Sequence, residues 1–215
     1  MLGYKPNITK QKLIFNSLIY SMLEHLQNKF PHLKPKWEEY RHLFHRIEVP
    51  AKTILLHEGD VSKKAWHIEK GCIRAWFNNK GRDLTLQFFF EGQSVSSLES
   101  FRRNIPSIYT LETIEPSIIY WVTKKDWELI MADIESTPEG KQVLSEFSLD
   151  RQLNYMRHFM SFIRDTPKER FINLLKERPE IIKRVPQHYI ASYLGITSVS
   201  LSRIRSAVSK MKIKE

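Results

Sequence analysis

The residues best suited to chemistry lie near the C-terminus, in the stretch IASYLGITSVSLSRIR from Ile190 to Arg205. Two short amphipathic runs meet there at Gly195, and the second run is rich in serine and arginine. Hydroxyl and guanidinium groups bind phosphate oxygens and the edges of DNA bases. The residue types therefore indicate a surface that contacts nucleic acid.

The spacing of apolar residues in this stretch is typical of a helix–turn–helix unit. Such a unit needs apolar residues where its helices touch, a small residue where they cross, and a residue that tolerates positive φ at the turn. We expect Thr197 to cap the second helix. The predicted core of the unit is Ile190, Ala191, Leu194, Gly195, Ile196, Leu201 and Ile204. A plain helical hairpin is the alternative, but it would not require all of these positions to be filled.

The predicted DNA-contacting face lies opposite Leu201 and Ile204 on the second helix, because successive residues turn by about 100°. Its N-terminal end would enter the major groove first. We expect Arg203 to donate to guanine O6 and N7 and Val199 to meet a thymine methyl group, while Arg205 points sideways. The full predicted set is Thr197, Ser198, Val199, Ser200, Ser202, Arg203 and Ser206. For each serine, a surface position without a DNA contact is the alternative.

The charge distribution favours a polyanionic partner for the same part of the chain. The net charge is +10, and the last 65 residues carry +9 of it, from 14 basic and 5 acidic side chains. Such asymmetry is typical of nucleic-acid-binding segments. A basic surface that is only solvated is the alternative.

The sequence lacks the residues that several classes of protein need. Cys72 is the one cysteine, so no disulfide framework, Cys-rich zinc site or iron–sulfur cluster is expected. No His-x-His pair occurs, which leaves a cupin-like metal-dependent enzyme without its ligands. We therefore expect no metal, no cofactor and no enzymatic activity. The chain shows neither a secretory signal nor an apolar run near 18 residues, so a cytoplasmic protein without membrane spans is expected.

The elements that must position this unit begin with a β-rich segment from Thr53 to Val122. Short runs of β-branched and aromatic residues alternate there with turn signals. Strands are expected in 53–60, in 65–71, on both sides of the turn Asn78–Gly81 within 72–90, and twice in 107–123. Five or more such strands indicate an antiparallel sandwich or roll.

Helices are expected on both sides of this β-rich segment. The predicted ranges are 8–30, 37–49, 124–134, 137–164 and 168–178. Within 137–164, apolar residues step by 4, 3, 4 and 3 positions, which is typical of a two-stranded coiled coil. The predicted dimer seam is Leu149, Leu153, Met156, Met160 and Ile163. Packing of this stripe on its own domain is the alternative.

A roll, a long helix and a C-terminal helix–turn–helix, in that order, resemble the CRP/FNR family of bacterial transcription regulators. The resemblance covers about residues 37–210 and is carried by ILLHEGD, WHIEKGCIRAWFNNKGRDLTLQFFFEGQ and VPQHYIASYLGITSVSLSRI. Pro106–Tyr109, PSIY, resembles an element of the branch common in Bacteroidetes. The implied fold is α+β, with an N-terminal antiparallel jelly-roll β-roll of the cyclic-nucleotide-binding kind, a long dimerisation helix and a C-terminal winged helix–turn–helix domain.

The resemblance also implies a domain plan and a function. The plan is an N-terminal helical extension over 1–36, a β-roll sensor domain over 37–135, a dimerisation helix over 136–164 and the winged domain over 165–215. The implied protein is a homodimer that regulates transcription from a near-palindromic operator in double-stranded DNA, and that contacts RNA polymerase if it activates. Its two recognition helices would lie about 34–36 Å apart.

The chain departs from the family pattern at the effector pocket. Family members that bind cyclic nucleotides use a glutamate for the ribose hydroxyl and an arginine for the phosphate. Ser97 and Ser107 align with these two positions. Cyclic AMP binding in the usual mode is therefore not expected, and the effector is unknown. The single cysteine excludes the oxygen-sensing variant, and His57 and His67 are either haem ligands or, as the alternative, ordinary surface or core residues.

The second helix departs as well, because Ser198 and Val199 replace the Arg-Glu or Pro-Glu pair common in the family. The operator should thus differ from the best-known family consensus. The alternative function is nucleic-acid binding without sequence specificity, through electrostatic attraction between the basic segment and the phosphate groups.

Overall fold

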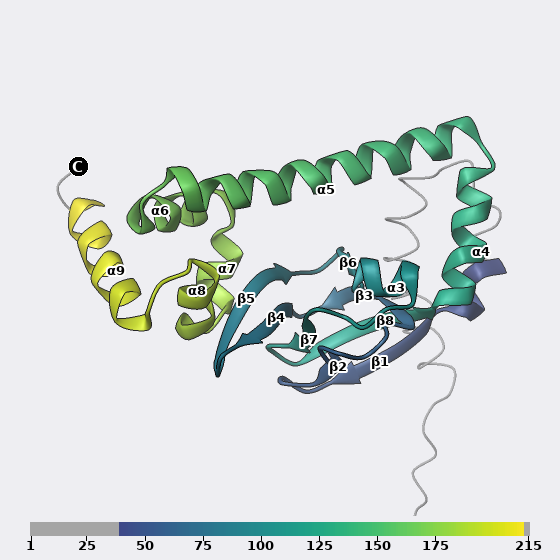
Figure 1. The fold of residues 1–215 in the computed structure, drawn as a ribbon, viewed down its shortest axis with the longest axis horizontal. Helices are drawn as coiled ribbons and strands as arrows, with labels where there is room; N and C mark the ends of the chain where they lie inside the picture. Colours follow the sequence, from purple (N-terminus) through teal and green to yellow (C-terminus); the bar gives the residue numbers. More distant parts are fainter. Residues whose placement is uncertain (1–38, 213–215) are drawn as a thin grey trace, which may run out of the picture.

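The computed structural model describes residues 39–212, whose strands form a β-roll of two four-stranded antiparallel sheets (Figure 1). The strand orders are β1-β8-β3-β6 and β2-β7-β4-β5. The strands are β1 His45–Val49, β2 Ile54–Leu56, β3 Lys64–Lys70, β4 Ile73–Asn79, β5 Arg82–Phe89, β6 Ser94–Val95, β7 Thr110–Thr113 and β8 Ser117–Thr123. The predicted roll is confirmed. The predicted helix over 8–30 and the extension over 1–36 lie outside the described residues.

Alternating side chains of the two sheets fill the inside of the roll. Ile68, Ile73, Leu111 and Ile119 are fully buried there, as expected for strands whose successive residues face opposite sides. The predicted hairpin joins β4 to β5, with Asn79 paired to Arg82. Its two turn residues, Lys80 and Gly81, have φ of 53° and 82°, which suits the two-residue turns that match strand twist.

The helix predicted over 37–49 is wrong from Phe44 onward, whereas residues 39–43 are helical. Residues 41–43 form a short 3-10 turn, and His45–Val49 then forms strand β1. β1 pairs with β8 residue by residue, from His45 with Trp121 to Val49 with Ser117. The apolar residues looked helical in spacing, but Ile47 and Val49 pack into the core of the roll. Tertiary pairing outweighs the weak local preference.

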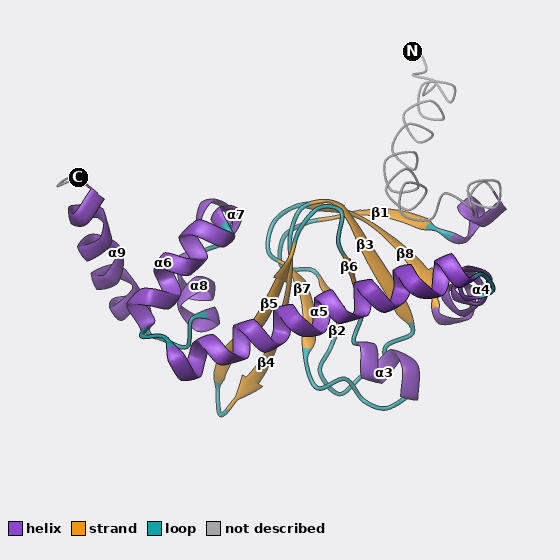
Figure 2. Ribbon diagram, turned by 90° about the horizontal axis from the view of Figure 1, so that it is seen from above, coloured by secondary structure: helices purple, strands orange, loops and turns teal. Residues whose placement is uncertain are grey.

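The helices of the described chain are α3 Leu98–Arg103, α4 Lys124–Glu135, α5 Pro138–Arg164, α6 Pro167–Glu177, α7 Pro179–Arg184, α8 Gln187–Tyr193 and α9 Ser198–Lys212. The predicted long helix corresponds to α5, which has 27 residues. Thr137 caps it by accepting from the backbone N–H of Gly140. α5 runs along the roll from α4 to the C-terminal helices, as Figure 2 shows from above. No helix between residues 39 and 212 is long and apolar enough to cross a membrane.

The C-terminal unit differs from the expectation in two ways. A wing is absent from residues 39–212, because every regular element after β8 is a helix. Ser206–Lys212 lacks glycine, proline and asparagine, and it simply continues α9. The unit also contains α7, which the sequence analysis missed. The predicted helix over 168–178 ends just before Pro179, but Pro179 begins α7, where a proline in the first turn leaves no intrahelical hydrogen bond unmade.

Candidate nucleic-acid interface

The structure places the predicted core of the helix–turn–helix between α8 and α9. Ile190, Ala191, Leu194 and Leu201 are buried, and Ile196 and Ile204 are half-buried. Gly195 lies in the turn between the two helices with φ of 67°. The hydroxyl of Thr197 accepts from the backbone N–H of Ser200 at 3.2 Å, so Thr197 caps α9.

The predicted DNA-contacting residues lie on the outside of α9. Ser198, Ser202, Arg203 and Ser206 are exposed, and Val199 is 61% exposed. This face is rich in hydroxyl groups and carries a guanidinium group that forms no salt bridge within the described chain. It therefore presents hydrogen-bond donors to whatever lies against α9.

Other members of the predicted set have hydrogen-bond partners within the protein. The Ser206 hydroxyl donates to the carbonyl oxygen of Ser202 at 3.1 Å. The hydroxyl of Thr197 donates to that of Ser200 at 3.0 Å, and Ser200 is half-buried. Arg205 is also half-buried, which agrees with its expected sideways direction. The side chains of Thr197 and Ser200 are therefore engaged in the N-terminal cap of α9.

The turn of the unit sits on the C-terminal end of α5. A Cβ atom built on Gly195 would lie 2.9 Å from Cε1 of Phe162. Arg170 donates to the carbonyl oxygen of Leu194 at 3.1 Å and to that of Asp165 at 2.8 Å. Its guanidinium also lies 4.8 Å from the Phe162 ring centroid. Leu194 and Gly195 belong to the turn that leads into α9. These contacts therefore couple the position of α9 to that of α5.

Gly195→Ala is expected to lower the free energy of unfolding by about 1–2 kcal/mol for the positive φ alone, and further through the contact with Phe162. Gly81→Ala is the matched control, because its φ is 82° but nothing lies within 4 Å of the added atom. Urea unfolding followed by circular dichroism compares the two variants. Equal losses would mean that the Phe162 contact adds nothing.

α8 packs on the edge strand β5 of the roll. The Ser192 hydroxyl accepts from the backbone N–H of Thr85 and donates to the carbonyl oxygen of Asp83, both at 2.8 Å. The Tyr193 hydroxyl donates to the side chain of Gln87 at 3.3 Å. The two bonds of Ser192 satisfy backbone groups that an edge strand would leave open. α8 therefore connects the candidate interface to the roll.

A buried ion pair lies beneath α8. Arg74 is 1% exposed, and its Nη2 is 2.7 Å from Oε2 of Glu112. The guanidinium lies 3.7 Å from the ring centroid of Tyr189, which belongs to α8. Stacking on an aromatic ring suits arginine, which is more weakly hydrated than lysine. Removal of α8 from the roll would expose this charge pair to water.

Arg184 of α7 makes the strongest ionic contact between the helical unit and the roll. Both of its terminal nitrogens donate to Glu91 at 2.7 Å, and Nη2 also contacts Glu115. The backbone N–H of Gly71 donates to the same Glu91 carboxylate at 2.8 Å. Together these donors lower the pKa of Glu91 from 4.5 to about 2, against the opposing effect of burial.

The Glu91–Arg184 pair predicts a pH dependence of stability. A carboxylate with a lowered pKa stabilises the folded state above its ordinary pKa of 4.5, and this contribution is lost as the pH falls toward 2. Glu91→Gln should therefore reduce the free energy of unfolding more at pH 6 than at pH 2.5. Urea unfolding of both proteins at the two pH values measures this. A difference that does not change with pH would contradict the pairing.

The predicted seam residues face away from the roll on α5. Leu149, Met156 and Met160 are about half exposed or more, Ile163 is 73% exposed, and Leu153 is half-buried. The stripe therefore does not pack on its own domain within the described residues. Residues on the other side of α5, such as Asn154, face the roll.

The two residues predicted for the effector pocket contact each other. Ser97 and Ser107 are buried, and their hydroxyl oxygens are 2.9 Å apart. The Ser107 hydroxyl also lies 2.6 Å from the carbonyl oxygen of Tyr109. The pair offers no charge to a ribose or a cyclic phosphate.

The histidines considered as haem ligands lie in different surroundings. His57 is exposed after β2, whereas His67 is buried in β3 with Nδ1 3.0 Å from the Ser94 hydroxyl. Residues 39–212 contain no group of three or more His, Cys, Asp or Glu side chains that could hold a metal ion.

Sequence reasoning missed the contacts between α7, α8 and the roll. Arg184 and Glu91 are 93 positions apart, and Ser192 and Thr85 are 107 apart. Neither pair leaves a local pattern in the sequence, although Arg184 belongs to the basic segment already noted.

Comparison with known proteins supports the roll and the helices that follow it. The cyclic nucleotide-binding domain family matches residues 46–133. The c-di-GMP-responsive global regulator CLP of Xanthomonas campestris is similar, with a TM-score of 0.63 and 16% identity over 83% of this chain and 93% of that one. FixK2 of Bradyrhizobium japonicum has a TM-score of 0.64 and 16% identity over 79% and 86% of the two chains. The curated proteins contain no match to this chain.

The sensor domain of the transcriptional regulator DNR from Pseudomonas aeruginosa is similar to the roll. Its TM-score is 0.53, with 14% identity over 65% of this chain and 93% of the sensor domain. Identities this low support the fold rather than a shared ligand. Residues 46–133 thus match the cyclic nucleotide-binding domain family, and the roll with its following helices has the fold of these regulators.

Proposed function

We propose that this chain is a homodimeric, sequence-specific transcription regulator of the CRP/FNR type, which recognises double-stranded DNA with α9. The observation that carries the proposal is the exposed outer face of α9, with Arg203 and four neighbouring residues directed away from a buried Leu201. A face of this kind, with its N-terminal end forward, suits the major groove.

The exposed stripe on α5 supports the proposed dimer. Four of its five residues, Leu149, Met156, Met160 and Ile163, are exposed, and an apolar helix stripe of this width needs a partner. Two copies of α9 related by a two-fold axis would recognise a near-palindromic operator with half-sites about 34–36 Å apart. The PSIY element favours the branch common in Bacteroidetes. The protein would act in the cytoplasm and contact RNA polymerase if it activates.

The proposed sensor domain does not bind cyclic AMP in the usual way, and we propose no catalytic activity. Ser97 and Ser107 lack the carboxylate and the cation that the nucleotide would need.

Selection of bound sequences from random duplex DNA at about 0.15 M salt tests the proposal, first without added ligand. Enrichment of a near-palindrome supports a specific regulator that binds DNA without an effector. If nothing is enriched, the selection is repeated with small molecules from a cell extract, which separates a missing effector from a protein that binds DNA without specificity.

Non-specific binding is the second candidate function, and the +9 charge of the last 65 residues favours it. In that case all duplexes would bind with similar affinity, and the affinity would fall steeply with salt.

A further inference from the structure

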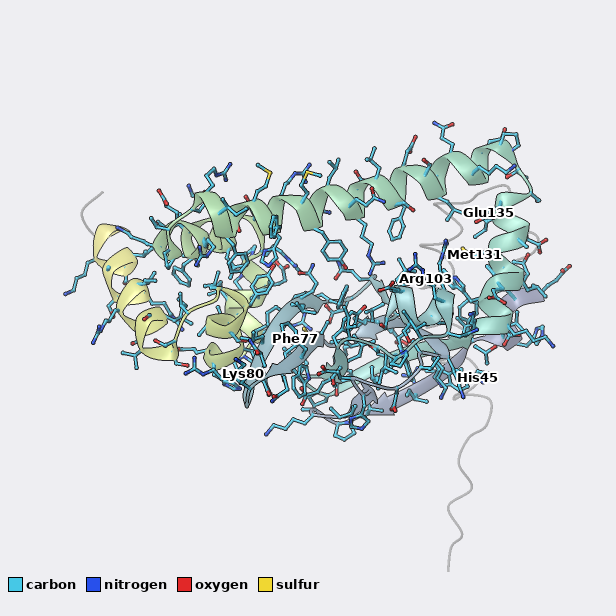
Figure 3. All side chains as sticks on the ribbon, in the orientation of Figure 1. His45, Phe77, Lys80, Arg103, Met131 and Glu135 are labelled. Atoms are coloured by element: carbon cyan, nitrogen blue, oxygen red, sulfur yellow. The ribbon has the colours of Figure 1, made fainter. Side chains whose placement is uncertain are left out.

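One histidine lies where α5, α8 and the edge of the roll meet. His158 is half-buried near the C-terminal end of α5, and its ring stacks on that of Tyr193 of α8, with centroids 4.5 Å apart and an interplanar angle of 12°. The ring of Phe162, one turn further along α5, meets the same imidazole edge-on at 5.1 Å. Figure 3 shows this end of α5 above the β4–β5 hairpin, whose residues Phe77 and Lys80 are labelled. His158 therefore belongs to the junction between the roll and the helix–turn–helix.

Tyr193 connects the histidine to the edge strand of the roll. Its hydroxyl donates to the side chain of Gln87 on β5 at 3.3 Å, and its ring centroid lies 5.3 Å from that of Phe88. Tyr193 is 5% exposed, so little water reaches its contact with His158. A change in the charge of His158 therefore acts directly on the contact that places α8 against β5.

The surroundings of His158 favour its neutral form. Burial is the main cause, and the cations Arg178 and Arg170 add to it, so that the pKa of His158 lies below its ordinary value of 6.5. Arg170 donates to the carbonyl oxygen of Leu194 at 3.1 Å. Arg178 donates to the carbonyl oxygen of Phe88 at 3.2 Å. Neither guanidinium group can move away from the imidazole without losing these bonds.

The carboxylates on the elements around His158 are paired with other groups or exposed. They are Glu180, which accepts from Arg178 at 3.1 Å, Asp165, which pairs with Arg164 at 2.6 Å, Asp83, which lies 3.8 Å from Arg74, Glu169 in the capping box of α6, and the exposed Glu177. Burial raises the pKa of Tyr193, so its hydroxyl is neutral as well. A proton on His158 would therefore place a third positive charge beside two guanidinium groups.

We propose that the stack of His158 on Tyr193 is a proton-sensitive contact, which strengthens the docking of α8 on the roll while the imidazole is neutral and weakens it when the imidazole is protonated. An imidazolium loses more hydration than a neutral ring on entering the same place, and it is repelled by the two guanidinium groups. Histidine is the side chain whose ordinary pKa lets it change charge between about pH 5 and pH 8, and protonation of histidines alters interfaces in other pH-sensitive proteins.

The direction of the pH effect follows from the docked and released states of α8. In the released state the pKa of His158 returns to its ordinary value of 6.5, whereas in the docked state it is lower. Docking is therefore strongest above pH 6.5 and weakens as the pH falls toward the pKa of the docked state. At about one pH unit below the ordinary pKa, the docking constant falls by up to about tenfold. The Glu91–Arg184 pair adds nothing to this change, because the pKa of Glu91 is about 2.

The consequence for DNA binding rests on the proposed function. α8 leads through the turn at Gly195 into α9, whose outer face is the candidate DNA interface. Weaker docking of α8 on β5 would free that face from the position that the roll gives it. Operator affinity should therefore depend on pH through His158, between about pH 5.5 and pH 7.5. The contact itself can be measured without DNA.

Hydrogen exchange of the backbone amides of α8, followed by mass spectrometry on the full chain without DNA, tests the contact. Rates at about pH 5.5 and about pH 7.5 are compared after correction for the intrinsic pH dependence of exchange. Protection of residues 187–194 should fall by up to about tenfold at the lower pH. His158→Phe keeps an aromatic ring against Tyr193 but cannot take up a proton, so its protection should be the same at both pH values.

His188→Gln is the matched control, because His188 is exposed on α8, and its pH dependence should equal that of the unchanged protein. An NMR titration of the His158 imidazole should give a midpoint below 6.5. A midpoint at or above that value, equal protection at both pH values in the unchanged protein, or an undiminished pH dependence in His158→Phe would overturn the proposal. Because these measurements contain no DNA, their outcome is independent of whether the selection finds a specific operator.

Discussion

Arg203→Ala should weaken binding to the selected operator by about 1–3 kcal/mol, which is roughly 5- to 150-fold. Arg203 is exposed opposite the buried Leu201 and has no carboxylate partner in residues 39–212. Its guanidinium is free to donate two hydrogen bonds to a guanine. Fluorescence anisotropy on the operator and on duplexes with single base-pair changes measures the loss and identifies the base position that is no longer discriminated.

Arg205→Ala is the matched control for this experiment. Arg205 lies two residues further along α9 and is half-buried, so its loss should weaken binding less and by a similar amount on every sequence. An equal loss on all sequences for Arg203→Ala would instead make Arg203 a phosphate contact. Specificity would then have to come from another residue of the same face.

Met156→Glu is expected to convert the dimer into a monomer of 25.6 kDa. Met156 is 56% exposed at the centre of the stripe, and in a two-stranded seam it would meet its own copy across the two-fold axis. Two carboxylates at that position would repel each other in an apolar environment, which is costly. Sedimentation equilibrium measures the mass. The affinity for the operator should also fall, because binding at one half-site no longer raises the effective concentration of a second subunit at the other.

Ser148→Glu adds the same carboxylate to α5 at an exposed position off the stripe. It should leave the dimer intact. A dimer that persists in the Met156→Glu variant would contradict the seam and would require another surface to hold the two copies together.

Much of the fold could be predicted because its signals are local. The turn Asn78–Gly81 predicted the β4–β5 hairpin, and the helix predicted over 137–164 corresponds to α5. The helix–turn–helix was also visible, since a small residue, a turn glycine and a cap stand within a few positions of one another. Each of these features depends on residues that are near in sequence.

The errors arose where distant contacts decide the structure. His45–Val49 forms a strand because β8 is available to pair with it, and a helical spacing alone cannot reveal that partner. The wing was inferred from the family resemblance, whereas the residues after Ser206 favour a continued helix. α7 was missed because a proline can begin a helix as well as end one.

The candidate site was predictable only in part, for the same reason. Helical periodicity predicted which residues lie on the outer face of α9. The packing of α8 on β5, in contrast, depends on long-range contacts such as that between Ser192 and Thr85. A cavity between α5 and the roll likewise exists because a helix begins beside α4 and crosses the roll. Its lining residues come from six elements and their flanking chain, and no motif joins them.

The most direct test of the account compares the dissociation constants of the full chain for the selected duplex and for a shuffled duplex of the same composition at about 0.15 M salt. We predict that the selected duplex binds about 10³-fold tighter or more. Equal affinities, with a steep loss at higher salt for both duplexes, would contradict a sequence-specific regulator and would leave the basic C-terminal segment as a non-specific ligand of DNA.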